Sequence, residues 1–165
     1  MVPPPRRRLV LLAGPAALLA GCATRPGNDA GAHALSCVPY ARARSGLRLR
    51  GDAWEWWQEA AGRYTRSREP RIGAVLVFAR TGRLRQGHLA VVARLVSTRE
   101  IRVDHANWAA EASGGRSRIA LDQPVRDVSA AGDWSLVRVW YPRLDELGAT
   151  AFEARGFILP GPAVA

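Results

Sequence analysis

The chain has 165 residues, of which 24 are basic and 14 are acidic, and its formal net charge is +10. This length fits one domain and excludes two domains of ordinary size. Every basic residue is arginine, which indicates a compositional bias toward arginine, so the charge alone does not indicate a nucleic acid as a partner. We expect no nucleic-acid partner, no cofactor and no metal.

The N-terminus has the pattern of a secretory signal, because a basic head precedes an apolar run at residues 9–20 that is short for a bilayer span. The segment Leu19-Ala20-Gly21-Cys22 resembles the bacterial lipobox. This resemblance implies cleavage before Cys22 and lipidation of that cysteine; the alternative is an ordinary cleaved signal with an incidental cysteine. We therefore expect a periplasmic lipoprotein held in the membrane by a lipid anchor. Ala23 lacks the aspartate associated with inner-membrane retention, which favours the outer membrane.

The cysteine count leaves one thiol to explain. If Cys22 is acylated, Cys37 is the only free cysteine and no intramolecular disulfide can form. A free thiol in an oxidising compartment is unfavourable unless it is buried or used. Removal of residues 1–21 takes away three arginines and leaves 21 basic against 14 acidic residues, or +7. That charge suits an acidic wall polymer or anionic lipid, or it is an arginine-rich solvated surface.

The composition divides the chain into four parts. After the signal peptide at residues 1–21, residues 22–34 are small and polar and predict a flexible tether. The folded domain is expected over residues 35–160. Residues 161–165 are expected to form a loose tail.

Helical signals come first in this domain. A short helix is predicted to begin after Ser36 and to end at Gly46. Asp52 and Glu55 have the spacing of a capping box, which predicts a second, amphipathic helix that ends at Gly62, with its tryptophans in the core.

Strand signals follow the helices. We expect a hairpin from residues 88–96 and 101–108, and other strands at 74–78, 117–121, 125–129 and 135–141, with a last extended segment at 156–160. Helices followed by a mostly antiparallel sheet predict an α+β fold.

Cys37 is a candidate nucleophile because it falls at a predicted helix N-terminus, where partial positive charge favours a thiolate. A nucleophilic cysteine also needs a histidine as base and a third group that orients the histidine. His33 lies in the tether, whereas His88 and His105 lie on strands. In strand geometry, Asn107 shares a face with His105.

The register of the hairpin decides whether these groups can meet. If Val96 pairs with Ile101, His88 lies on the same face as His105 and diagonally opposite Asn107. A slip of one residue would break this arrangement, and the length of the connection does not exclude such a slip.

Several segments in this order resemble one known family: "CVPYARARSG", "AWEWWQEA", "GAVLVF", "GHLAVVARLV", "IRVDHANW" and "DWSLVRVW". They resemble the CHAP domain, the cysteine, histidine-dependent amidohydrolase/peptidase family. The resemblance implies a papain-like (NlpC-type) fold, in which N-terminal helices pack on a mostly antiparallel sheet. It also implies cleavage of amide bonds in peptidoglycan peptides, with peptidoglycan as the partner and no cofactor.

Carried over by position, the resemblance implies that Cys37 is the nucleophile and His88 the general base and acid. Many CHAP domains have glutamate at the position of His105 and asparagine at that of Asn107. The orienting role is therefore open between His105 and Asn107, and Trp108 is expected to shield the site from water. A neutral histidine lacks the negative charge that would stabilise an imidazolium, so the Cys–His pair would be less ionised than with glutamate.

Two other interpretations remain open at this point. The domain is a catalytically inactive CHAP-like lipoprotein that binds peptidoglycan or a protein partner, or Cys37, His88 and His105 form a zinc site. The spacing of these three residues argues against zinc, because metal sites usually show tighter local spacing.

Overall fold

The computed structural model describes residue 1 and residues 36–108, 118–141 and 143–161. Apart from residues 1 and 161, the predicted signal peptide, lipidation site, tether and tail therefore lie outside the described residues. Among the described residues, no helix has the length and apolar character needed to cross a membrane. The elements are α1 (Cys37–Ser45), the 3₁₀ helix η2 (Ala53–Glu55), α2 (Trp56–Glu59), β1 (Arg66–Ser67), β2 (Val75–Phe78), β3 (His88–Ser97), β4 (Glu100–Ala106), β5 (Ile119–Asp127), β6 (Leu136–Tyr141) and β7 (Glu146–Ile158).

The helices begin and end where the local sequence signals are found. Ser36 occupies the N-cap position of α1, although its side chain makes no capping bond, and Gly46 ends the helix with φ of 75°. The capping box of Asp52 and Glu55 is formed at the start of η2. The second helical segment is shorter than predicted, because η2 and α2 together cover only Ala53–Glu59.

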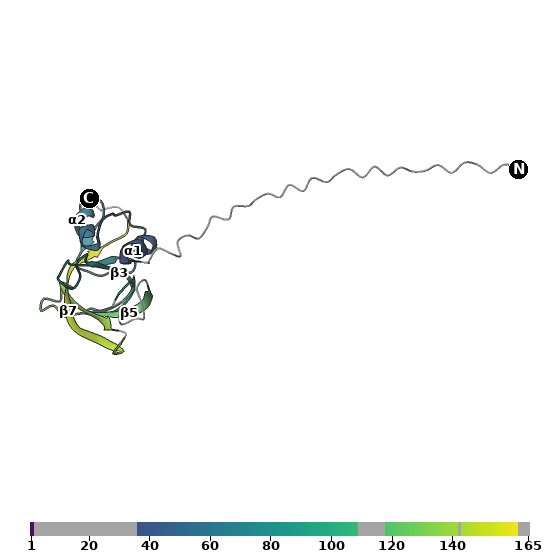
Figure 1. Ribbon diagram of the computed structural model, residues 1–165. Helices are drawn as coiled ribbons and strands as arrows, with labels where there is room; N and C mark the ends of the chain where they lie inside the picture. Colours follow the sequence, from purple (N-terminus) through teal and green to yellow (C-terminus); the bar gives the residue numbers. More distant parts are fainter. Residues whose placement is uncertain (2–35, 109–117, 142, 162–165) are drawn as a thin grey trace. The chain divides into compact units, whose positions relative to one another are not determined.

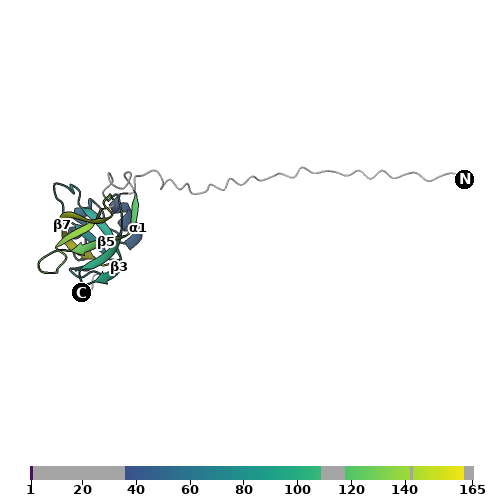
Figure 2. The same ribbon diagram turned by 90° about the horizontal axis from the view of Figure 1, so that it is seen from below.

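The strands form a closed antiparallel barrel. The order of neighbouring strands is β1-β7-β2-β3-β4-β5-β6, and β7 also pairs with β6, so the ring from β2 to β7 has no open end. β7 makes this closure possible because it is long: its C-terminal part pairs with β2 at Val75↔Ile158, and its N-terminal part pairs with β6 at Tyr141↔Glu146. Figure 1 shows the strands encircling a common centre, and Figure 2 shows them from below.

The expected α+β, papain-like fold is therefore wrong for the described part of the chain. That part is mostly β, with two short α-helices, and its sheet closes on itself instead of forming one layer under N-terminal helices. The prediction failed mainly at residues 146–155, which were not expected to be extended. Without this part of β7, nothing would join β6 to β2.

Two apolar clusters hold the fold together. All six barrel strands contribute to the interior cluster, which contains Ala74, Leu76, Phe78, Ala90, Val92, Ile101, Val103, Trp108, Val125, Trp134, Val137, Val139, Ala154 and Phe157. The second cluster lies between the outer face of β2 and β3 and the N-terminal segments, and contains Ala41, Leu47, Leu49, Ala53, Trp56, Ala60, Val75, Val77, Leu89, Val91 and Ile158. In the first half of β3, alternation thus sends Ala90 and Val92 into the barrel, and Leu89 and Val91 into the outer cluster with α1 residues. Figure 1 shows α1 beside β3.

Candidate active site

The histidine pair lies inside one end of the barrel. His88 begins β3 and His105 lies near the end of β4; both are buried, with relative exposures of 4 % and 0 %. His88 Nε2 and His105 Nδ1 are 3.2 Å apart, so one ring donates a hydrogen bond to the other. This contact leaves Nδ1 of His88 as the nitrogen that is not used in the pair.

Register shifts in the hairpin bring the two histidines together. At the turn, Ser97 pairs with Glu100, but after two shifts of one residue each, Val91 pairs with Asp104. If this last register is continued, His105 falls opposite Ala90 and diagonal to His88. The prediction that both histidines share a face therefore agrees with the structure, but the diagonal neighbour is His105 instead of Asn107.

Asn107 does not follow the alternation of β4. The strand ends at Ala106, and Asn107 has φ of 61°, in the left-handed region. Its backbone N–H donates to the carbonyl of Arg118, and its side chain is exposed, whereas both histidine rings are buried. The strand alternation on which the expectation for Asn107 depends therefore stops at Ala106, and the role of Asn107 stays a prediction.

Aromatic rings surround the histidine pair. Trp108 stacks on His105 with an angle of 20° between the planes, and its ring centre lies 4.8 Å from that of His88. Phe78 and His88 form a T-shaped contact, with ring centres 5.5 Å apart. Trp108 is held in place by a hydrogen bond of 3.2 Å from its Nε1 to the carbonyl of Trp140. These rings pack around the pair, and His105 Nε2 has no hydrogen-bond partner among the described residues.

Burial keeps both imidazoles neutral. Desolvation lowers the pKa of His105 to about 3. Desolvation, together with repulsion from His105, lowers the pKa of His88 well below its usual value. The charged form of either ring is therefore disfavoured at neutral pH.

Cys37 lies at the first turn of α1, half-buried against the outer apolar cluster. Burial raises the pKa of its thiol, and the nearby negative charge of Asp52 adds to this effect. The backbone N–H groups of Leu89, Val38 and Cys37 act in the opposite direction by hydrogen bonding to the sulfur. The net direction differs from the expectation for a helix N-terminus, because desolvation outweighs the favourable N–H groups.

The contact with Leu89 places the thiol beside the peptide that directly follows His88. The backbone of β3 directly after His88 thus lies beside Cys37, but no hydrogen bond that joins the sulfur to either histidine is found within residues 36–108. The N–H groups of Val38 and Leu89 are candidate oxyanion donors that sequence reasoning did not identify. The position of the Leu89 N–H near the sulfur depends on how α1 packs against β3, and no local sequence motif indicates this packing.

The arrangement does not resemble a metal site. Among the described residues, no three His, Cys, Asp or Glu side chains are grouped so that they could hold a metal ion.

Residues 27–107 match the family model of the CHAP domain. The match covers just under half of the chain and includes Cys37, His88, His105 and Asn107, while β5, β6 and β7 lie beyond it. A comparison with curated proteins found no match. The family match supports a CHAP domain in this segment. CHAP domains are in general cysteine- and histidine-dependent amidohydrolases that act on peptidoglycan. The match therefore suggests an activity of the peptidoglycan-hydrolase type in general.

Proposed function

We propose that this protein is a thiol-dependent hydrolase that cleaves an amide bond in peptidoglycan peptides, as an amidase or an endopeptidase. The observation that carries the proposal is the contact between the Cys37 thiol and the peptide after His88, whose ring is in turn held by His105. The backbone N–H groups of Val38 and Leu89, which lie near the sulfur, are candidate donors for the tetrahedral oxyanion.

The raised thiol pKa and the lowered histidine pKa imply a neutral resting pair. As the sulfur attacks the amide carbon, the thiol proton passes to Nδ1 of His88, and an S–C bond forms. His88 then gives this proton to the leaving amine, the C–N bond breaks, and a thioester remains. His88 then removes a proton from water as the water oxygen attacks the thioester carbon. The C–S bond breaks, and His88 returns this proton to the sulfur, which releases the acid and the free thiol.

His105 is proposed as the orienting residue. For His88 to accept a proton at Nδ1, its Nε2–H must donate to His105 Nδ1, which fits the 3.2 Å contact. A neutral histidine fixes the ring but provides no negative charge to stabilise an imidazolium, so proton transfer has to occur together with attack on the substrate. Trp108 is proposed to shield this pair from water, in keeping with its contacts to both rings.

The test is release of soluble muropeptides from purified sacculi by the full chain in detergent. Cys37→Ala is expected to abolish release, and unchanged release would refute the mechanism. His105→Gln is expected to lower turnover more than Asn107→Ala does. His105→Glu, which installs the acid of many CHAP domains, is expected to keep activity and change its pH profile; a loss equal to that of His105→Gln would argue against an orienting role.

A second function, binding to peptidoglycan or a protein partner without catalysis, is favoured by one observation. Cys37 has no hydrogen bond to His88 within residues 36–108, and burial disfavours its thiolate. This function predicts binding to sacculi that survives iodoacetamide, with no cleavage at any pH. It also predicts that Cys37 reacts with iodoacetamide no faster than free cysteine at each pH.

Anchoring by a lipid on Cys22, in the outer membrane in preference to the inner, completes the proposal. It is supported by the lipobox-like segment of the sequence alone. Cys22→Ser is expected to release the protein from the membrane fraction. Continued tight association would contradict lipidation.

A further inference from the structure

A pocket of about 470 Å³ lies beside η2 and α2, and Arg50, Gly51, Trp54, Glu55, Gln58 and Glu59 line it. Its two acids are engaged elsewhere. Glu55 Oε2 accepts a hydrogen bond of 2.7 Å from the backbone of Asp52, and Glu59 forms an ion pair with Arg63. The groups in the lining that remain for a ligand are the Arg50 guanidinium, the Gln58 amide and the Trp54 indole.

The segment that forms this pocket also contacts the proposed catalytic groups. The backbone N–H of Trp54 donates to the carbonyl of Gln86, two residues before His88. The fit is so close that a Cβ on Gly87 would lie 2.8 Å from the Trp54 nitrogen. On the same segment, Asp52 is near enough to the Cys37 thiol to raise its pKa. The pocket therefore lies next to the place where a scissile bond would be held.

Two arginines at this rim have no acidic partner among the described residues. The guanidinium of Arg80, from the loop between β2 and β3, lies 5.6 Å from the centre of the Trp54 ring. Neither Arg80 nor Arg50 takes part in any of the six ion pairs found among the described residues. Exposed arginines beside an aromatic ring suit a planar anion, because the guanidinium fork matches a carboxylate in a bidentate manner.

We infer that this pocket is a substrate subsite for a free carboxylate on the peptide, next to the amide that is cleaved. Arg50 binds the carboxylate, Arg80 adds positive charge across the indole, and Trp54 packs against the aliphatic part of the same residue. This inference rests on the proposed function for the identity of the peptide. It predicts that the protein prefers peptides whose side-chain or α-carboxyl group is free over peptides in which that group is a carboxamide.

The test uses two wall peptides that differ only in one group, a free carboxylate or its carboxamide. Their binding to the full chain carrying Cys37→Ala is measured by titration calorimetry, so that no cleavage occurs. The free carboxylate is expected to bind about tenfold or more tightly, the usual effect of a charge-assisted hydrogen bond. Arg50→Gln in the same background is expected to reduce this preference to less than about twofold, with little effect on the carboxamide peptide.

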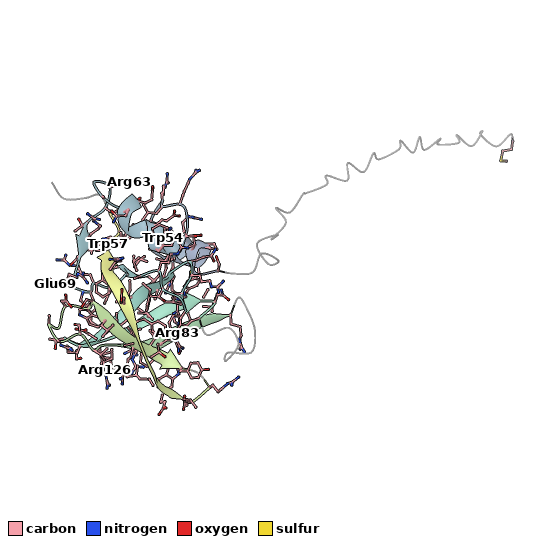
Figure 3. All side chains as sticks on the ribbon, turned by 60° about the vertical axis from the view of Figure 1, so that its left-hand side comes forward. Trp54, Trp57, Arg63, Glu69, Arg83 and Arg126 are labelled. Atoms are coloured by element: carbon pink, nitrogen blue, oxygen red, sulfur yellow. The ribbon has the colours of Figure 1, made fainter. Side chains whose placement is uncertain are left out.

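Arg138→Gln serves as the matched control, since it removes the same charge from an exposed position on β6. Arg138 pairs in register with Arg126, which lies well away from Trp54 and Trp57 in Figure 3. The control is expected to retain the preference for the free carboxylate. The subsite is refuted if the two peptides bind equally, if neither binds, or if Arg138→Gln reduces the preference as much as Arg50→Gln does.

The active chain separates this inference from the proposed function. Preferential binding of the carboxylate peptide without any cleavage would overturn the hydrolase and leave the subsite supported. Cleavage of both peptides with the same kcat/KM would overturn the subsite and leave the hydrolase supported.

Discussion

The buried histidine pair should make the stability of the fold depend on pH. Burial lowers the pKa of His105 from 6.5 to about 3, so between these values the unfolded chain binds a proton there and the folded chain does not. Stability is therefore greatest above pH 6.5 and is lost as the pH falls. Linkage gives a loss of about 2 kcal/mol in the free energy of unfolding between pH 7 and pH 5 for His105 alone. His88 adds a loss of the same sign, because its pKa is lowered as well.

Urea unfolding of the full chain at pH 7, 6 and 5 measures this effect. The window avoids most carboxylate titration, since exposed Asp and Glu have pKa values of about 4. His105→Gln is expected to remove about 2 kcal/mol of the pH-dependent loss, whatever its effect on stability at pH 7. Asn107→Ala, a neighbouring change that removes no titrating group, is expected to leave the pH dependence unchanged. The reasoning is refuted if the wild-type stability changes by less than about 0.5 kcal/mol, or if His105→Gln retains the full loss.

Three other changes test the surroundings of the site. Asp52→Asn is expected to lower the pKa of the Cys37 thiol and to speed its alkylation by iodoacetamide at pH 7.5 roughly two- to fivefold, as one nearby charge would; a slower reaction would contradict this assignment. Trp108→Ala is expected to reduce the free energy of unfolding by about 3–5 kcal/mol, measured in urea, because it removes the indole that packs against both histidines and leaves a cavity there. Gly87→Ala is expected to cost about 1–3 kcal/mol or more, since its φ is 70° and a Cβ would lie 2.8 Å from a backbone nitrogen of η2. Gly82→Ala, where a Cβ would meet nothing within 4 Å, should be neutral, and equal losses at the two glycines would refute the argument.

Local signals predicted the helical region well. The end of α1 at Gly46 and the capping box at Asp52 depend on residues a few positions apart, so the sequence contains the cause of each. The strands β3 and β4 were also predicted near their observed bounds, because their β-branched residues are dense and a short connection separates them.

The closure of the barrel was not predictable from such signals. The first ten residues of β7, "ELGATAFEAR", are rich in alanine, glycine and glutamate, which are uncommon in strands. This segment is extended because β2 and β6 both pair with β7. The paired residues of β2 lie 76 or more positions away in the sequence, and those of β6 lie 5 to 17 positions away. The two short predicted strands at 117–121 and 125–129 similarly form one strand, β5, held between β4 and β6.

The candidate site was partly predictable. The sequence made Cys37, His88 and His105 candidates, which they remain, and strand parity predicted that the two histidines share a face, as the structure has them. The left-handed backbone at Asn107 and the donor N–H of Leu89 were missed, because they depend on where β4 stops and on how α1 lies against β3. The direction of the thiol pKa was also missed, since burial is a property of the whole fold.

The two register shifts between β3 and β4 constrain how this hairpin can tolerate deletions. Each shift is an extra residue on β3, so deleting that residue removes the bulge while Val91 still pairs with Asp104 and the two histidines stay on one face. β4 has no extra residue in these pairs, so deleting one of its residues would slip the register by one and send His88 and His105 to opposite faces. Among relatives of this chain, gaps in this hairpin should thus fall on β3 beside Arg94 and not on β4, a pattern that substitutions alone would not reveal.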